Sequence, residues 1–392
     1  MDPFVVEWLN LLARWGHMIA GIAWIGTSFY FVALDFSLRK IEGLPAGVSG
    51  EAWEVHGGGF YRVQKYLTAP AEMPDHLIWF KWEAYLTWVT GFILLVLQYY
   101  INAESFLIDP AVLPLLPWQA IAISVGSLLG GWIIYDLLCR SSLVGRPRLL
   151  GLLVLFLILT ASYGFTQVFS GRGAFIHVGA FIGTIMAANV FAVIIPNQRK
   201  ITASLLRGEK PDPRFSITGK QRSLHNTYLT LPVLLMMTSN HYAMITENPH
   251  SWILIGLIVV GGASLRHFLV RIEVGDDLAS LTWTLPLIAS ALVGALMLTE
   301  PEKLPVYEGV VSNEDAIAIV TSRCSSCHAA TPTDPTIKTA PKGVALETLD
   351  DLKRYAQQIG KQAVHSKAMP LGNKTGMLPE ERAKLGAWIA AQ

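Results

Sequence analysis

The chain has 392 residues, of which 52% are hydrophobic and only 15% are charged, and its net charge is +1. This composition is typical of a membrane protein that carries an additional soluble part. It lacks the strong positive charge of a nucleic-acid-binding protein, so we expect no nucleic-acid partner.

Apolar runs long enough to cross a lipid bilayer, about 20 residues each, follow one another along most of the chain. They lie at about residues 8–34, 77–101, 114–138, 149–169, 174–196, 226–245, 251–270 and 279–299. The predicted fold class is therefore all-α, with a polytopic eight-helix transmembrane bundle in residues 1–299. We expect a linker at 300–311 and a small all-α domain at 312–392.

Basic residues in the connecting loops predict the orientation of the bundle. An even number of spans places both termini on one side, and cytoplasmic loops of membrane proteins are enriched in Lys and Arg. Every second loop is basic, whereas the loops between them contain Arg172 as their only basic residue. The basic positions are Arg39, Lys40, Arg62, Lys65, Arg140, Arg146, Arg148, Arg199, Lys200, Arg207, Lys210, Arg214, Lys220, Arg222 and Arg271. Both termini are therefore predicted to lie outside.

The first span carries a polar stripe. Arg14, His17, Gly21, Trp24 and Ser28 recur at helical spacing, so they share one face of a helix. Small and polar residues within a span normally face other helices rather than lipid. We expect this face to point into the bundle.

Three histidines lie in the outer half of the predicted bundle, namely His17, His177 and His241. Histidines at one depth are candidates for axial ligands of a b-type haem held between helices. His17 and His177 form the first pair that we consider, with His241 in reserve. The alternative is that each histidine is hydrogen-bonded to backbone or water.

Three other histidines, His76, His225 and His267, lie near the inner side. They are candidates for a second haem or a substrate pocket, and the alternative is a position in the membrane interface. The glycine triplet at 57–59 lies in the first inner loop. Because no strand–helix pattern surrounds it, we interpret it as a turn and not as a nucleotide-binding loop.

The most specific motif of the chain is Cys324-Ser325-Ser326-Cys327-His328. A C-x-x-C-H sequence is typical of a covalently attached c-type haem, in which Cys324 and Cys327 form thioethers and His328 binds iron. A zinc site would need further ligands at metal-site spacing, and Cys139 is remote. The histidine beside the second cysteine also disfavours a redox dithiol. The motif therefore predicts haem c in residues 312–392.

The second axial ligand of this haem is predicted to be a methionine. Met369 precedes a proline in a Gly- and Pro-rich loop, and a predicted amphipathic helix follows at 379–389. Met377 and His365 are the alternatives, and Met377 is better suited to packing against a macrocycle. The order of motif, loop and helix resembles small soluble cytochromes c. Because c haems are attached outside the cytoplasmic membrane of bacteria, we expect this domain and the N-terminus to be periplasmic.

Several membrane segments carry a resemblance that extends to the domain order. They are Arg14–Gly26, Ala187–Arg199, Leu224–Pro232 and Ser239–Tyr242. Together with the fused C-terminal domain, they resemble the bacterial integral-membrane urate oxidases. The first-span pattern around His17 and Trp24 is also similar to the membrane protoporphyrinogen oxidases, over a shorter stretch.

The resemblance implies oxidation of urate to 5-hydroxyisourate without hydrogen peroxide. Electrons would leave through haem c to a respiratory-chain acceptor, either a soluble cytochrome c or a terminal oxidase. Arginine suits a planar anion such as urate, so Arg14 and Arg172 are candidate anchors on the outer side, and Arg62 or Arg266 on the inner side. The alternative function is an electron-transfer cytochrome subunit between quinol and a terminal oxidase, with no organic substrate of its own.

Overall fold

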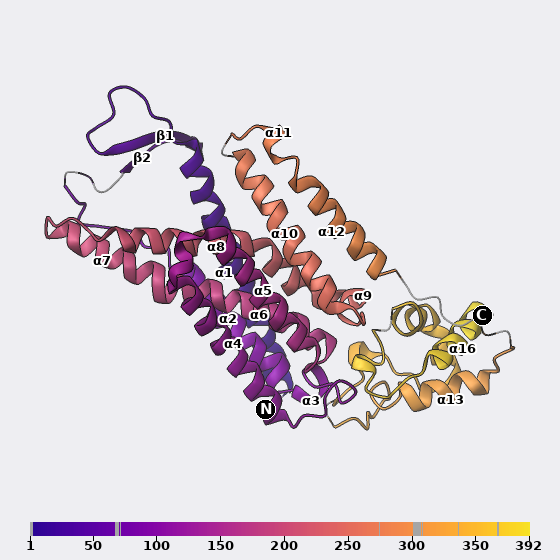
Figure 1. Cartoon of the computed structure of the whole chain (residues 1–392). Helices are drawn as coiled ribbons and strands as arrows, with labels where there is room; N and C mark the ends of the chain where they lie inside the picture. Colours follow the sequence, from indigo (N-terminus) through magenta and orange to yellow (C-terminus); the bar gives the residue numbers. More distant parts are fainter. Residues whose placement is uncertain are drawn as a thin grey trace.

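The computed structural model describes residues 3–66, 70, 72–273, 275–300, 307, 309–335, 337–366 and 368–392. These residues form a long helical bundle, a two-stranded hairpin and a C-terminal helical domain (Figure 1). The predicted linker at 300–311 falls largely outside the described residues.

The bundle contains both long helices and short helical turns. Its elements are α1 (Pro3–Ser37), α2 (Trp82–Leu95) with the π-helix η1 (Val96–Tyr100), α3 (Ala103–Phe106), α4 (Pro117–Arg140), η2 (Ser142–Gly145), α5 (Pro147–Thr166), α6 (Gly171–Ala188) with the π-helix η3 (Asn189–Ile194) and α7 (Ile195–Leu206), α8 (Pro213–Thr238), η4 (Ser239–His241), α9 (Ala243–Thr246), α10 (Ser251–Glu273), α11 (Leu278–Leu281) and α12 (Thr284–Leu298).

Within the described part of the chain, five helical segments are long and apolar enough to cross a membrane. They are Phe4–Ser37, Pro117–Arg140, Pro147–Thr166, Gly171–Leu206 and Ser251–Ile272. The other three apolar runs are also helical and form α2 with η1, the second half of α8 and the shorter helix α12. That these three cross the membrane remains a prediction.

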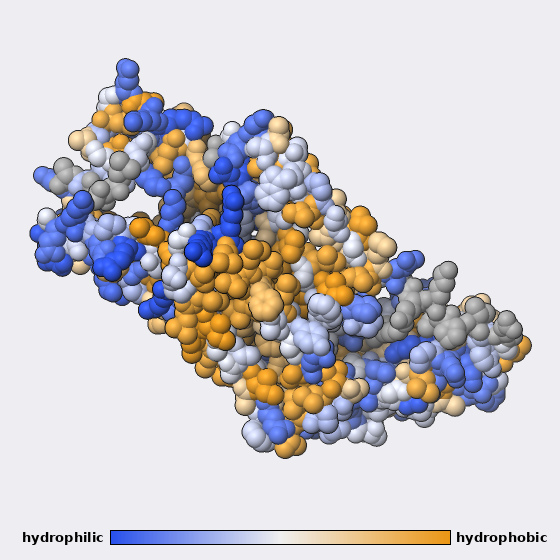
Figure 2. Space-filling view, viewed as in Figure 1, coloured by the Kyte–Doolittle hydropathy of each residue, from blue (hydrophilic) through white to orange (hydrophobic). Residues whose placement is uncertain are grey.

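On the face shown in Figure 2, a belt of exposed apolar side chains covers the middle of the bundle and hydrophilic residues gather at its ends. Figure 1 shows the hairpin, α7 and α11 at one end, which we call the hairpin end. The N-terminus, α3, α9 and the C-terminal domain lie at the other, the α3 end. On α4 and α5 the belt includes Leu129, Ile133, Leu137, Leu152 and Phe156. Lipid would cover such a surface without the penalty that water imposes.

Helix α6 forms the centre of the bundle because its neighbours α4, α5 and α8 all pack against it. Phe181, Ile182 and Ile185 on α6 are buried. A Cβ atom on Gly131 of α4 would lie only 1.9 Å from the ring of Phe181, so this close crossing of α4 and α6 requires glycine.

An antiparallel hairpin of β1 (Val48–His56) and β2 (Gly59–Tyr66) occupies the first predicted inner loop. The expectation of an all-α chain is wrong for this segment. The predicted glycine turn is confirmed, because Gly57 and Gly58 connect the strands with φ values of 59° and 81°.

The C-terminal domain is built from short helical pieces around its own core. They are α13 (Asn313–Arg323), η5 (Pro341–Gly343), α14 (Leu349–Arg354), α15 (Ala356–Ile359), the π-helix η6 (Gly360–His365), η7 (Leu371–Asn373) and α16 (Pro379–Ala390). Val320, Leu385 and Trp388 are buried in this core. Helix α16 confirms the amphipathic helix predicted at 379–389.

Candidate functional site

A cavity of about 900 Å³ lies between α1, α2, α6 and α8. Its volume is in the usual range for small-molecule sites. Arg14, His17, Gly21, Trp24 and Ser28 of α1 all line it. The prediction that this stripe faces the bundle is therefore confirmed, and the opposite face of α1 belongs to the exposed apolar belt.

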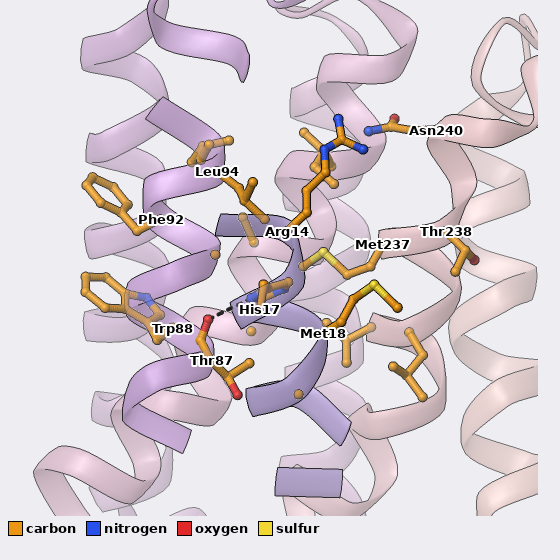
Figure 3. Close-up of a pocket in the computed structure, with 18 of the residues that line it drawn as sticks. Arg14, His17, Met18, Thr87, Trp88, Phe92, Leu94, Met237, Thr238 and Asn240 are labelled. Carbon is orange, nitrogen blue, oxygen red and sulfur yellow. Dashed lines mark hydrogen bonds between the residues drawn. The ribbon is translucent and has the colours of Figure 1, made fainter. Parts of the chain in front are cut away.

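Polar groups gather where the cavity approaches the α3 end. Arg14, Arg172, Asn10 and Asn240 line this part, and Figure 3 shows the Arg14 guanidinium and the Asn240 amide pointing toward each other. Asn240 donates to the Tyr99 hydroxyl at 2.7 Å. Three buried atoms, Asn10 Oδ1, Asn240 Oδ1 and Arg172 Nε, have no hydrogen-bond partner among the described residues. Buried polar atoms are normally paired, so this wall is suited to a polar ligand.

His17 lies deeper in the cavity and is held from one side. Its Nδ1 is 3.0 Å from the Thr87 carbonyl oxygen (Figure 3). The same atom is 3.1 Å from Thr90 Oγ1. Gly91 lies against the ring, where an added Cβ would be 2.9 Å from Cε1. Because both hydrogen bonds use Nδ1, Nε2 is available to a ligand in the cavity.

The structure places the other two outer histidines differently. His241, which is exposed, lines the cavity. His177 is fully buried outside the cavity. Its Nε2 is 2.6 Å from Ser124 Oγ and its Nδ1 is 2.7 Å from the Gly173 carbonyl oxygen, so both ring nitrogens are occupied. The cavity thus brings together His17 and His241, and not His17 and His177.

The inner histidines do not form one group. His225 Nδ1 lies 2.7 Å from the Tyr135 hydroxyl, whereas His267 Nδ1 lies 2.7 Å from the Tyr228 hydroxyl. His76 is exposed in the segment before α2. Each histidine therefore has separate surroundings.

The inner arginines named from the sequence have protein partners. Arg62 forms a 2.6 Å ion pair with Glu51 across the hairpin, and hydrogen bonds from Gln64, Arg62 and Trp53 hold the pKa of Glu51 below its usual range. The Arg266 guanidinium lies 3.7 Å from the ring centroid of Phe29. Neither arginine lines the cavity.

A buried polar network near the hairpin end was not predicted. Arg222 donates to Asp136 Oδ1 at 2.7 Å and to Asn189 Oδ1 at 3.3 Å. Asn189 in turn donates to Tyr135 Oη and Asn226 Oδ1, both at 3.0 Å. From the sequence, Arg222 counts among the basic loop residues, and its helical spacing of four from Asn226 is the feature that indicates a shared helix face.

The C-x-x-C-H segment follows α13 and packs on the core of the C-terminal domain. His328 Nδ1 lies 2.9 Å from the Val344 carbonyl oxygen, which leaves Nε2 available for iron. Burial raises the pKa of Cys324 to about 11, and burial also raises the pKa of Cys327. Redox-active dithiols normally have a lowered thiol pKa, so these surroundings differ from those of a reactive dithiol.

The two candidate methionines differ in their burial. Met369 is partly buried and packs, like Cys324, at the edge of the domain core, whereas Met377 is 2% exposed and belongs to the core itself. The Met369 carbonyl accepts a hydrogen bond from Arg382 Nη1 at 2.8 Å. Together, Cys324, Cys327, His328 and Met369 fit the attachment and ligation of a c-type haem.

Comparisons with known proteins give one clear match. A family model described as Urate oxidase N-terminal matches residues 3–299, which include the whole cavity. No curated protein and no solved structure matches the chain.

Proposed function

Because the chain belongs to the urate oxidase N-terminal family, we propose that it oxidises urate in the membrane cavity and passes the electrons to its own C-terminal domain. Family membership supports a urate-related oxidoreductase. The C-terminal motif supports the electron route, because it combines haem-attaching thiols with two potential iron ligands.

The polar wall at the α3 end supports urate as the ligand of the cavity. Urate is a planar purine that is anionic at neutral pH, with N–H donors and carbonyl acceptors around its edge. Arg14 and Arg172 supply positive charge and parallel donors. Asn10 Oδ1 and Asn240 Oδ1 supply acceptors that have no partner among the described residues. These unpartnered atoms are the observation that carries the proposal.

The reaction that we propose is balanced without dioxygen. The urate monoanion loses two electrons and one proton to give neutral dehydrourate, and water then adds at C5 to give 5-hydroxyisourate. Because the electrons go to the C-terminal domain and not to oxygen, no hydrogen peroxide forms. Arg14 and Arg172 would bind the urate anion, and the cavity wall would exclude bulk water from the oxidised ring.

We propose that Cys324, Cys327, His328 and Met369 hold one haem c. When bound, this group supplies a one-electron acceptor with a potential raised by its methionine ligand. The chain's own part is to bind it covalently through the thiols and to fix the His328 ring through the Val344 carbonyl.

A b-type haem in the cavity is a further part of the proposal. Urate gives up two electrons and a c haem accepts one, so a second carrier would let both leave together. His17 fits a ligand role because its Nε2 is available, and His241 also lines the cavity. His177 fits this role less well because both its nitrogens are hydrogen-bonded.

The location that we propose is the inner membrane of a bacterium. The N-terminus and the C-terminal domain would be periplasmic, because covalent attachment of haem c occurs there and the basic loops lie at the opposite end of the bundle. The final acceptor would be a soluble cytochrome c or a terminal oxidase.

The alternative is an electron-transfer subunit that oxidises quinol. Its support is the size of the cavity, about 900 Å³, together with apolar walls from Met18, Ile22 and Ile25. Such a cavity is generous for a purine alone and suits a larger, partly apolar ligand.

Anaerobic titration of the purified protein distinguishes the two functions. We expect urate to reduce haem c, whereas reduction by quinol alone would favour the electron-transfer subunit. Arg172→Gln should weaken urate binding roughly tenfold to hundredfold, because a hydrogen bond to a charged group is worth about 1.5–3 kcal/mol. Arg148→Gln, an exposed arginine near the hairpin end, is the matched control and should leave binding unchanged. Equal urate affinity in both variants would contradict the proposed anchor.

A further inference from the structure

Helix α3 lies between the cavity and the C-terminal domain. Phe106 of α3 and the preceding Asn102 line the cavity, while α3 packs against η7 of the C-terminal domain (Figure 1). Because η7 begins at Leu371, this contact is formed directly beside Met369. The cavity wall and the methionine loop are thus separated by one turn of helix.

The position of α3 is fixed by the first residue before α6. The Ser170 N–H donates to the Leu107 carbonyl at 2.9 Å, and Ser170 Oγ donates to the Phe106 carbonyl at 2.6 Å. The same Oγ accepts from the Gly173 N–H at 3.1 Å and so caps α6. Since α6 begins beside Arg172, α3 is held rigidly to the helix that carries a proposed urate anchor.

The methionine loop is fixed just as firmly. Arg382 is 3% exposed and donates to the carbonyl oxygens of Met369 and Ala363. Its Nη2 also lies 3.4 Å from Asn373 Oδ1 in η7, and the Met369 N–H donates to the Gln362 carbonyl at 2.8 Å. Both sides of the contact are therefore preorganised.

A carboxylate, Glu247, lies where α9 packs against the start of α6. Glu247 follows α9, which packs closely on α6, since a Cβ on Gly171 would lie 1.9 Å from the Thr246 carbonyl oxygen. Burial raises the pKa of Glu247, Arg172 and Arg382 oppose this rise, and Asp109 adds to it. The packing of Thr246 on Gly171 places Glu247 near Arg172, and the positive charges of Arg172 and Arg382 both favour its ionised form.

We propose that α3 and Glu247 form an internal docking site that holds η7 of the same chain against the wall of the cavity. Glu247 and Leu371 are positioning residues, and the occupant of the site is the methionine loop. The docking itself follows from the contacts alone. Its purpose, a short path for electrons from the cavity to the C-terminal domain, rests on the proposed function.

Leu371→Lys in the full-length, haem-loaded protein tests the docking. Leu371 is half-buried in η7, the element that packs against α3. A lysine there would lose hydration on docking, and a penalty of about 1.4 kcal/mol lowers the docked population about tenfold. We expect urate-driven reduction of haem c to slow by that factor, with the same rate of reduction by dithionite and the same midpoint potential. We also expect faster hydrogen exchange at the α3 amides, whose N–H groups at Phe106 and Leu107 donate within the helix.

Two further variants keep the test decisive if Leu371→Lys folds poorly. Glu247→Gln removes the negative charge at constant shape and should slow urate-driven reduction by up to about fivefold, because it ends the attraction to Arg172 and Arg382. Val310→Lys, at a side chain that is 98% exposed in the linker just before the C-terminal domain, is the control and should match the wild type in both assays. Unchanged α3 exchange and unchanged reduction in Leu371→Lys and Glu247→Gln would overturn the docking site. If urate fails to reduce the wild type, the proposed function fails, and the exchange comparison still decides the docking.

Discussion

Replacing Gly91 with alanine tests whether the position of His17 in the cavity matters. The added Cβ would lie 2.9 Å from His17 Cε1, whereas carbon atoms normally approach to about 3.5–4.0 Å, so the ring must shift by roughly 0.6–1.1 Å. Hydrogen bonds of 3.0 and 3.1 Å to Thr87 and Thr90 would then exceed the normal range. At about 1 kcal/mol for each bond, the original ring position loses about 2 kcal/mol, or roughly thirtyfold in population.

Gly126→Ala is the matched control for this change. Gly126 also lies within a helix, but an added Cβ there meets nothing within 4 Å. Both substitutions improve intrinsic helix propensity by about 1 kcal/mol, so a difference between them reports the contact with His17. We expect Gly91→Ala to lose most urate-driven reduction and any b-type haem in a pyridine haemochrome assay, at nearly unchanged thermal stability in detergent. Equal rates in the two variants would refute the requirement for His17.

The C-terminal domain provides two further predictions. Met369→Ala should abolish the long-wavelength iron–sulfur absorption of the oxidised protein. Met377→Ala should keep this absorption and lower the melting temperature, because Met377 lies in the core. The opposite pattern would make Met377 the iron ligand and Met369 the packing residue. Partial burial alone would raise the pKa of Glu381, but hydrogen bonds from Arg323 and the Leu378 N–H outweigh burial and lower it. A lowered folded-state pKa contributes stability above the ordinary glutamate range, and this contribution is lost as the pH falls. Acid melting curves should therefore show less pH dependence in Glu381→Gln than in the wild type, and identical curves would exclude the pair as a contributor.

The sequence predicted the positions of the helices and their buried faces better than it predicted which helices pack against one another. A run of apolar residues can satisfy its backbone in lipid only as a helix, which is why α4 and α5 lie close to the ranges predicted for them. Helical spacing likewise placed the Arg14 stripe on the face toward the cavity. Which helix meets that face depends on packing between segments far apart in sequence, so His177 was paired with His17 although it faces Ser124 of α4.

The missed hairpin has a different cause. The charges and glycines of this loop predict a cytoplasmic turn but no strands. β-branched and aromatic residues nevertheless flank Gly57 and Gly58 on both sides. Val55 and Phe60 pair directly across that turn. Such a pattern is typical of a β-hairpin, and it determines the structure of this segment although the rest of the chain is largely helical.

The two ends of the bundle predict the side from which urate would enter. The cavity reaches Arg14, Arg172 and the exposed His241 at the α3 end. Nearer the hairpin end, Arg222 and Asp136 form a buried ion pair of 2.7 Å. Breaking a buried pair costs several kcal/mol, so this end should stay closed during turnover. We therefore expect spheroplasts, whose periplasmic face is open, to consume added urate at once, and sealed inside-out vesicles to consume it only after permeabilisation. If the vesicles are the faster of the two before permeabilisation, either the orientation of the bundle or the entrance at the α3 end is wrong, and protease accessibility of the C-terminal domain in the same vesicles would tell which.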